Sequence, residues 1–125
     1  MSHKTILIID DENDIREVAS LALETGGDFD VLTAAGGVAG LVEASARRPD
    51  LILLDVMMPE LDGPSTFRRL QELEETRPIP VIFLTAKVQP SERRKLAELG
   101  ALGIIAKPFD PMRLADEIAA IAGWN

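Results

Sequence analysis

Five short apolar runs recur along the chain, and each gives way to a stretch with helical spacing. Several runs are apolar at consecutive positions and rich in β-branched residues, a pattern typical of parallel strands covered on both faces. We predict strands at residues 5–9, 29–33, 51–54, 80–85 and 102–106. Strands that alternate with helices imply right-handed crossovers and a parallel sheet between two helix layers. The predicted fold is therefore α/β, a doubly wound five-stranded sheet, and no linker or compositional break divides residues 1–125.

The segments between these strands are predicted to be helices. The first runs from Asn13 to a stop at Gly26 and Gly27, and the second ends before Pro49. The apolar pattern of the second is weaker and consists of Val38, Leu41, Val42 and Ser45. The third has Pro64 in its first turn. Its side chains predicted to point inward are Phe67, Leu70 and Leu73.

Two more helices complete the pattern. The fourth spans Ser91 to Leu99 and ends at Gly100. Asp110 and Pro111 form an N-cap and N1 pair that is predicted to open the fifth helix. One face of this helix carries Leu114, Ile118, Ile121 and Ala122.

Composition then excludes several classes of protein. The chain has no cysteine, which removes thiol nucleophiles, disulfides and thiolate metal sites. A net charge of −8 argues against a general binder of nucleic acid, which needs a clustered basic surface. The N-terminal apolar run, Ile6 to Ile9, is too short for a signal peptide or a membrane span. We expect a cytoplasmic domain that binds neither nucleic acid nor membrane.

Polar side chains collect where the predicted strands end. These are Asp10 and Asp11 after the first strand, Asp55 after the third, Thr85 after the fourth and Lys107 after the fifth. In open α/β sheets the ligand site lies outside the carboxyl ends of the strands. Taken singly, each residue is more often a helix cap or a surface group. Taken together, three neighbouring carboxylates repel one another unless a cation offsets them, and Mg²⁺ prefers such oxygen ligands.

A carboxylate-bound metal beside a lysine and a hydroxyl group suits a phosphoryl group, whose negative charge is spread over several oxygens. The sequence has no glycine-rich loop for holding a nucleotide. The phosphoryl group is therefore predicted to become attached to the protein itself. Asp55 is the candidate nucleophile, because a carboxylate can form an acyl phosphate and the buried strand before it holds it in place.

In the combination of these residues, the chain resembles the receiver domain of response regulators in two-component signalling. The resemblance spans almost the whole chain and is carried by Asp10-Asp11, DVMMP at 55–59 with Asp62-Gly63, Thr85-Ala86 and Lys107-Pro108-Phe109. It implies a flavodoxin-like strand order of 2-1-3-4-5. It also implies that a histidine kinase or a histidine phosphotransfer protein donates a phosphoryl group from histidine to Asp55.

The resemblance further implies a role for each site residue. Mg²⁺ would be bound by Asp10, Asp11, Asp55 and the backbone carbonyl of Met57, with Asp10 acting largely through water. The phosphoryl oxygens would be contacted by Thr85 and Lys107, and the bond before Pro108 would be cis. The implied partners are a downstream effector protein or an output domain outside this sequence. A homodimer through the fourth helix, fifth strand and fifth helix is also plausible.

One position departs from the family pattern. Ile104 stands three residues before Lys107, where Tyr or Phe is common in the family. Switching is therefore expected either to depend on Thr85 and loop repacking alone or to be smaller than is typical of the family. Met57 and Lys87 should flank the path of attacking water. We predict that Met57 restricts this path and slows loss of the phosphoryl group, and the equal alternative is that it merely covers the edge of the site.

Two other functions remain open at this point. The first is a phosphorylation-independent interaction module with the same fold, which Ile104 supports and the full set of phosphoryl-binding residues opposes. The second is an aspartyl-phosphate phosphatase, which ranks last because Met57 stands where such enzymes carry an acid. The basic run Arg93 to Lys95 is either a docking surface or a solvated face, and the pattern favours the solvated face.

Overall fold

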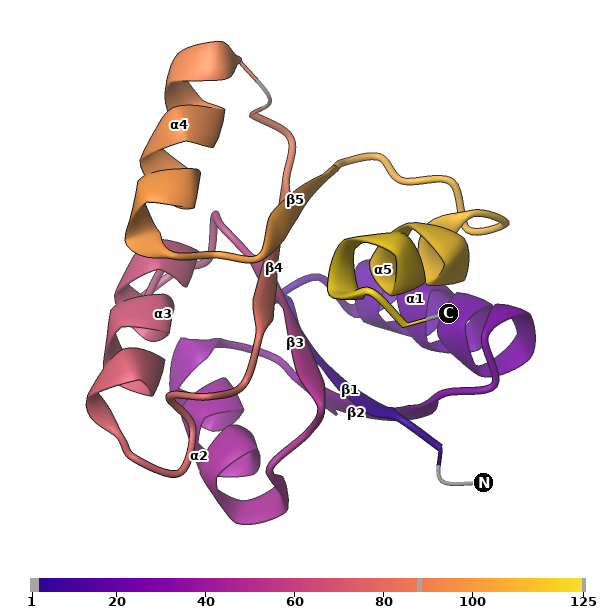
Figure 1. Ribbon diagram of the computed structural model, residues 1–125, viewed down its shortest axis with the longest axis horizontal. Helices are drawn as coiled ribbons and strands as arrows, with labels where there is room; N and C mark the ends of the chain where they lie inside the picture. Colours follow the sequence, from indigo (N-terminus) through magenta and orange to yellow (C-terminus); the bar gives the residue numbers. More distant parts are fainter. Residues whose placement is uncertain (1–2, 88, 125) are drawn as a thin grey trace.

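The protein folds into one five-stranded parallel sheet with helices on both faces (Figure 1). The computed structural model describes residues 3–87 and 89–124. The strands are β1 Thr5–Ile9, β2 Asp30–Ala34, β3 Leu51–Asp55, β4 Val81–Thr85 and β5 Gly103–Ala106. The helices are α1 Asn13–Gly26, α2 Gly37–Arg47, α3 Gly63–Glu72, α4 Pro90–Leu99 and α5 Leu114–Ala122. The strand order is β2-β1-β3-β4-β5, so the predicted fold and order are confirmed.

The sheet divides the hydrophobic core into two halves. Helices α1 and α5 cover one face, and α2, α3 and α4 cover the other (Figure 1). Successive residues of β1 alternate between them, with Ile6 and Ile8 in the first half and Leu7 and Ile9 in the second. Every residue of β3 and β4 is buried, which explains why both read as unbroken apolar runs. The strand ends are therefore held rigidly.

The loop from β3 to α3 returns the chain closely over the end of β3. Asp62 caps α3 by accepting a hydrogen bond from the Ser65 N–H at 2.8 Å. Gly63 opens the helix, and a Cβ there would collide with the backbone carbonyl of Asp55. Only glycine allows this close approach, so Gly63 fixes the loop against the predicted phosphoacceptor.

The predicted start of the fifth helix is wrong. Helix α5 begins at Leu114, and the residue before it is Arg113. The Asp110 carboxylate instead accepts a hydrogen bond from the Met112 N–H at 2.9 Å, and the Asp110 carbonyl accepts one from the Arg113 N–H at 2.9 Å. Asp110 thus forms a turn closed by its own side chain, a local alternative that aspartate offers to helix capping.

Two details of the other helices also differ from prediction. Leu73 does not point inward, because it lies just beyond the end of α3 and is 39% exposed. Val38 and Val42 of α2 fit the helical spacing from which this helix was predicted, but both side chains face outward. The buried residues of α2 include Gly40, where a Cβ would collide with Ile9 of β1, so this helix lies too close to the sheet for valine on its inner face.

The smaller boundary shifts leave the topology unchanged. Strand β2 begins one residue later than predicted, and β5 begins at Gly103, leaving Leu102 exposed. The bond between Lys107 and Pro108 is cis, as the family resemblance implied. Across the described residues, no helix combines the length and hydrophobicity needed to cross a bilayer.

Candidate metal and phosphoacceptor site

The predicted site residues come together at the carboxyl ends of β1 and β3. The register of these neighbouring strands pairs Ile9 with Leu54, so the next residues, Asp10 and Asp55, lie side by side. Asp55 is only 3% exposed and Asp10 is fully buried, whereas Asp11 reaches solvent. Two buried aspartates at the ends of apolar strands are costly for stability, which indicates that they serve binding or chemistry.

The three carboxylates can converge on one cation. Asp10, Asp11 and Asp55 can each offer one carboxylate oxygen, and these oxygens lie within 4.8 Å of one another. Asp10 Oδ2 is buried and accepts no hydrogen bond from any described residue. The Lys107 ammonium group lies 3.0 Å from it, and a carboxylate set partly open to water is what Mg²⁺ prefers. The residues present therefore fit Mg²⁺.

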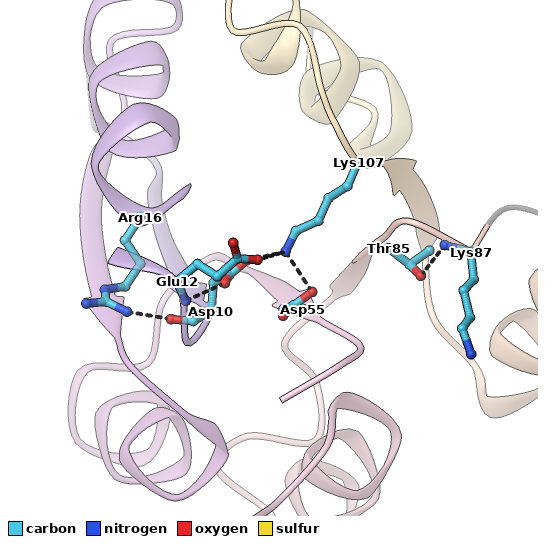
Figure 2. A network of polar contacts seen from close by, with 7 residues as sticks. All are labelled: Asp10, Glu12, Arg16, Asp55, Thr85, Lys87 and Lys107. Atoms are coloured by element: carbon cyan, nitrogen blue, oxygen red, sulfur yellow. Dashed lines mark hydrogen bonds and ion pairs between the residues drawn. The ribbon is translucent and has the colours of Figure 1, made fainter. Parts of the chain in front are cut away.

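Lys107 directly follows β5, and its side chain reaches this cluster (Figure 2). Its Nζ lies 3.0 Å from Asp10 Oδ2, as an ion-pair partner outside hydrogen-bonding geometry, and 3.1 Å from Asp55 Oδ1. The Lys107 backbone N–H donates to the Thr85 carbonyl at 2.8 Å, which ties the start of this loop to the end of β4. The ammonium group is thus placed beside the candidate nucleophile.

The pKa values of both Asp55 and Lys107 are raised in the folded protein. Burial is the largest influence on Asp55, and with the negative charge of Asp10 it raises the pKa of Asp55 from 3.8 to about 6, although Lys107 opposes the shift. Burial alone would lower the pKa of Lys107, but the carboxylates of Asp10 and Asp55 outweigh it and raise that pKa above its ordinary value. At pH 7, Lys107 is charged and Asp55 is mostly ionised.

Thr85 and Met57 stand apart from this cluster. Thr85 is buried, and its Oγ1 accepts a hydrogen bond from the Lys87 N–H at 3.0 Å (Figure 2). Among the described residues, no hydrogen bond joins Thr85 Oγ1 to Asp55 or Lys107. The Met57 side chain is 61% exposed in the loop after β3. The roles expected for the Thr85 hydroxyl and the Met57 carbonyl remain predictions.

Two residues that sequence reasoning missed also support the site. Glu12 Oε1 accepts a hydrogen bond from Lys107 Nζ at 3.2 Å. Arg16 donates from Nη1 to the Asp10 carbonyl at 2.7 Å, holding the turn that carries Asp10 and Asp11 (Figure 2). The sequence signal for both residues is their place near the two aspartates, with Glu12 directly after them and Arg16 about one helical turn further on, and it does not specify the contacts that they make.

Comparison with known proteins identifies this arrangement. The sequence profile of the response regulator receiver domain matches residues 6–119. The chain belongs to that family. The receiver domain is 42% identical over 121 residues to the phosphate regulon transcriptional regulatory protein PhoB of Pseudomonas aeruginosa, covering 97% of this chain and 52% of that protein. It is 38% identical to the alkaline phosphatase synthesis transcriptional regulatory protein PhoP of Bacillus subtilis, covering 95% of this chain and 48% of that protein. The receiver domain thus spans about half the length of these relatives.

Solved structures agree with the family assignment. The receiver domain is similar to the chemotaxis protein CheY4 of Vibrio cholerae, with a TM-score of 0.89, 29% identity and coverage of 96% of this chain and 99% of that one. It is also similar to the receiver domain of the sensor histidine kinase PA1611 of Pseudomonas aeruginosa, with a TM-score of 0.85, 30% identity and coverage of 98% and 99%. That structure is described with a magnesium ion coordinated in its active site cleft. The predicted family and its place in two-component signalling are confirmed.

Proposed function

We propose that this receiver domain takes a phosphoryl group onto Asp55 in a Mg²⁺-dependent reaction and thereby changes its partner-binding surface. The donor would be a phosphohistidine on a histidine kinase or a histidine phosphotransfer protein. The observation that carries the proposal is the position of Lys107 Nζ, 3.1 Å from Asp55 Oδ1 within a cluster of three carboxylates. This combination of nucleophile, cation and metal ligands suits phosphoryl transfer better than it suits a structural role.

The transfer step uses the ionised form of Asp55. A carboxylate oxygen attacks phosphorus, a P–O bond forms, and the P–N bond to the donor histidine breaks with its electron pair remaining on nitrogen. A pKa of about 6 keeps Asp55 mostly ionised at pH 7 and leaves it more basic than an exposed aspartate. Burial at the end of β3 limits its movement, so the attacking oxygen is oriented before the donor arrives.

The neighbouring groups offset the charge of the transferred phosphoryl group. Asp10, Asp11 and Asp55, with the Met57 carbonyl, would hold Mg²⁺, which when bound neutralises negative charge on the phosphoryl oxygens. Lys107 supplies a second positive charge, 3.1 Å from Asp55 Oδ1. Thr85 Oγ1 now accepts from the Lys87 N–H, and its own proton is left for donation to a phosphoryl oxygen after rotation of the side chain.

The proposed partners follow from the proposed phosphoryl transfer. Besides the phosphohistidine donor, we propose a downstream effector protein or output domain that distinguishes the phosphorylated form. The relatives PhoB and PhoP are described as transcriptional regulatory proteins, which favours an output of that kind. Homodimerisation through α4, β5 and α5 and a cytoplasmic location belong to the proposal.

Intact mass tests the proposed chemistry. The chain is incubated with Mg²⁺ and a small-molecule phosphodonor, beside Asp55→Asn and a sample with the metal chelated. We expect a gain of one phosphoryl group in the wild type, none in Asp55→Asn, and little in Asp11→Asn, which keeps the nucleophile but removes one metal ligand. No gain in folded wild type that binds Mg²⁺ would contradict the proposal and favour the phosphorylation-independent module.

A further inference from the structure

Helices α3 and α4 lie on the face of the sheet opposite α1 and α5 (Figure 1). A groove there is lined by residues of both helices and of the loops after β3 and β4. Its volume is about 700 Å³, within the range of clefts that hold ligands. The apolar part of its lining consists of Val56, Pro64, Leu96 and Leu99. Leu96 is buried and Leu99 half-buried, so the groove offers a hydrophobic floor between two helices.

The rim of this groove carries positive charge. Arg68 extends from α3, Lys95 from α4 and Lys87 from the loop after β4, and all three are exposed. Within residues 3–87 and 89–124, none of the three has a carboxylate within 4.0 Å. Charged groups without partners at the edge of an apolar floor are free to pair with a ligand.

The charge of the wider region has the same sign. Helices α3 and α4 with Lys87 carry six of the 13 lysines and arginines of the chain but only three of its 21 acidic residues. Two of these acids, Glu92 and Glu98, line the groove, and Glu92 lies in the first turn of α4, where the helix N-terminus stabilises a negative charge. The region is therefore basic on a chain whose net charge is −8.

We propose that the α3–α4 groove binds an acidic segment of a partner protein. An apolar side chain of that segment would lie on the floor at Leu96 and Leu99, and its carboxylates would pair with Arg68, Lys87 and Lys95. Charge complementarity selects an acidic occupant. A nucleic acid fits less well, because its backbone extends beyond the basic region and would meet the negative charge of the remaining surface.

The groove also reaches the end of β4, the strand next to the one that ends in Asp55. Thr85 lines its inner end, and the Thr85 Oγ1 is held by the Lys87 N–H at 3.0 Å. If Thr85 turns toward a phosphoryl oxygen, this hydrogen bond breaks and the backbone at Lys87 is released. Occupancy of the groove and phosphorylation should then alter each other's equilibrium by the same factor. This coupling rests on the proposed function, whereas binding to the groove does not.

Selection from a displayed library of short random peptides tests the binding. The library is selected on the unphosphorylated 125-residue chain, and the enriched peptides are titrated against wild type, the Arg68→Glu/Lys95→Glu variant and Arg47→Glu, a charge-reversal control on α2. We expect enriched peptides to combine acidic and apolar residues, to bind the double variant at least about tenfold more weakly, and to bind Arg47→Glu as tightly as wild type. An Arg68→Gln/Lys95→Gln variant with a smaller loss would exclude misfolding as the cause.

Several results would overturn the binding proposal. These are no enrichment, enrichment of basic or uncharged peptides, equal weakening by Arg47→Glu, equal competition by a DNA oligonucleotide, or self-association of the chain through this face. A separate measurement decides the coupling, namely titration of the same peptide before and after treatment with phosphodonor. Unchanged affinity in protein shown by mass to be phosphorylated would refute the coupling alone, and absence of phosphorylation would refute the proposed function and leave groove binding standing.

Discussion

Replacing Asp55 by asparagine is predicted to stabilise the metal-free receiver domain at neutral pH. Burial and the charge of Asp10 raise the pKa of Asp55 from 3.8 to about 6. Since one pKa unit corresponds to about 1.4 kcal/mol, keeping Asp55 ionised in the folded state at pH 7 costs about 3 kcal/mol relative to the unfolded chain. Asparagine has nearly the same shape and no charge, so the Asp55→Asn substitution removes this cost.

The size of the gain depends on pH in a defined direction. The pKa of Asp55 in the folded protein lies above its value in the unfolded chain. The protonated side chain therefore stabilises the wild type fully below pH 3.8, and this stability is lost as the pH rises through about 6. The Asp55→Asn variant lacks this loss. Its advantage in free energy of unfolding should therefore be about 3 kcal/mol at pH 7 and under about 1 kcal/mol at pH 4.

Urea denaturation in the presence of a chelator measures this difference at both pH values. Glu24→Gln is the control, because it removes one negative charge from an exposed position on α1 outside the cluster. With Mg²⁺ added, the wild type should gain stability and Asp55→Asn should gain less, because it has lost a ligand. A metal-free Asp55→Asn variant less stable than wild type at pH 7, or a control that gains as much, would refute the reasoning.

Three further predictions concern residues around the site. Met57→Ala is predicted to lose the phosphoryl group faster than wild type if the long side chain restricts the path of attacking water, and equal decay rates by intact mass would contradict this. Gly63→Ala should lower the free energy of unfolding by about 2 kcal/mol, because its Cβ would collide with the Asp55 backbone, and unchanged urea denaturation would refute that collision. Arg16→Gln should weaken Mg²⁺ binding about tenfold by releasing the Asp10 carbonyl, and calorimetry showing wild-type affinity would count against this positioning role.

Much of the fold could be predicted because its main signals are local. The consecutive apolar residues of β3 and β4 are buried on both faces, so the sequence alone marks these strands and the polar residues that end them. The convergence of Asp10 and Asp55 then follows from parallel pairing. The local pattern was less informative for α2, because the distance between this helix and the sheet determines which of its residues face inward. Gly40 lies close to Ile9, and the valines of α2 face outward.

Contacts distant in sequence could not be predicted in the same way. Glu12 and Lys107 are 95 residues apart, and nothing in either neighbourhood signals their hydrogen bond. The orientation of Thr85 toward the Lys87 N–H depends on the loop after β4 and not on strand periodicity. The sequence pattern favoured a solvated face for the basic run Arg93 to Lys95. Lys95 lines a groove because α4 packs beside α3, a contact that the sequence pattern does not specify.

Trapping the phosphorylated residue tests the central claim most directly. An aspartyl phosphate is reduced by borohydride to homoserine, so the chain is treated with phosphodonor and Mg²⁺, reduced, digested and sequenced by tandem mass spectrometry. We predict homoserine at position 55 and at no other aspartate, and none when the metal is chelated. Homoserine at Asp10, Asp11 or another position, or phosphorylated protein that yields no homoserine, would contradict the assignment of Asp55 as the phosphoacceptor.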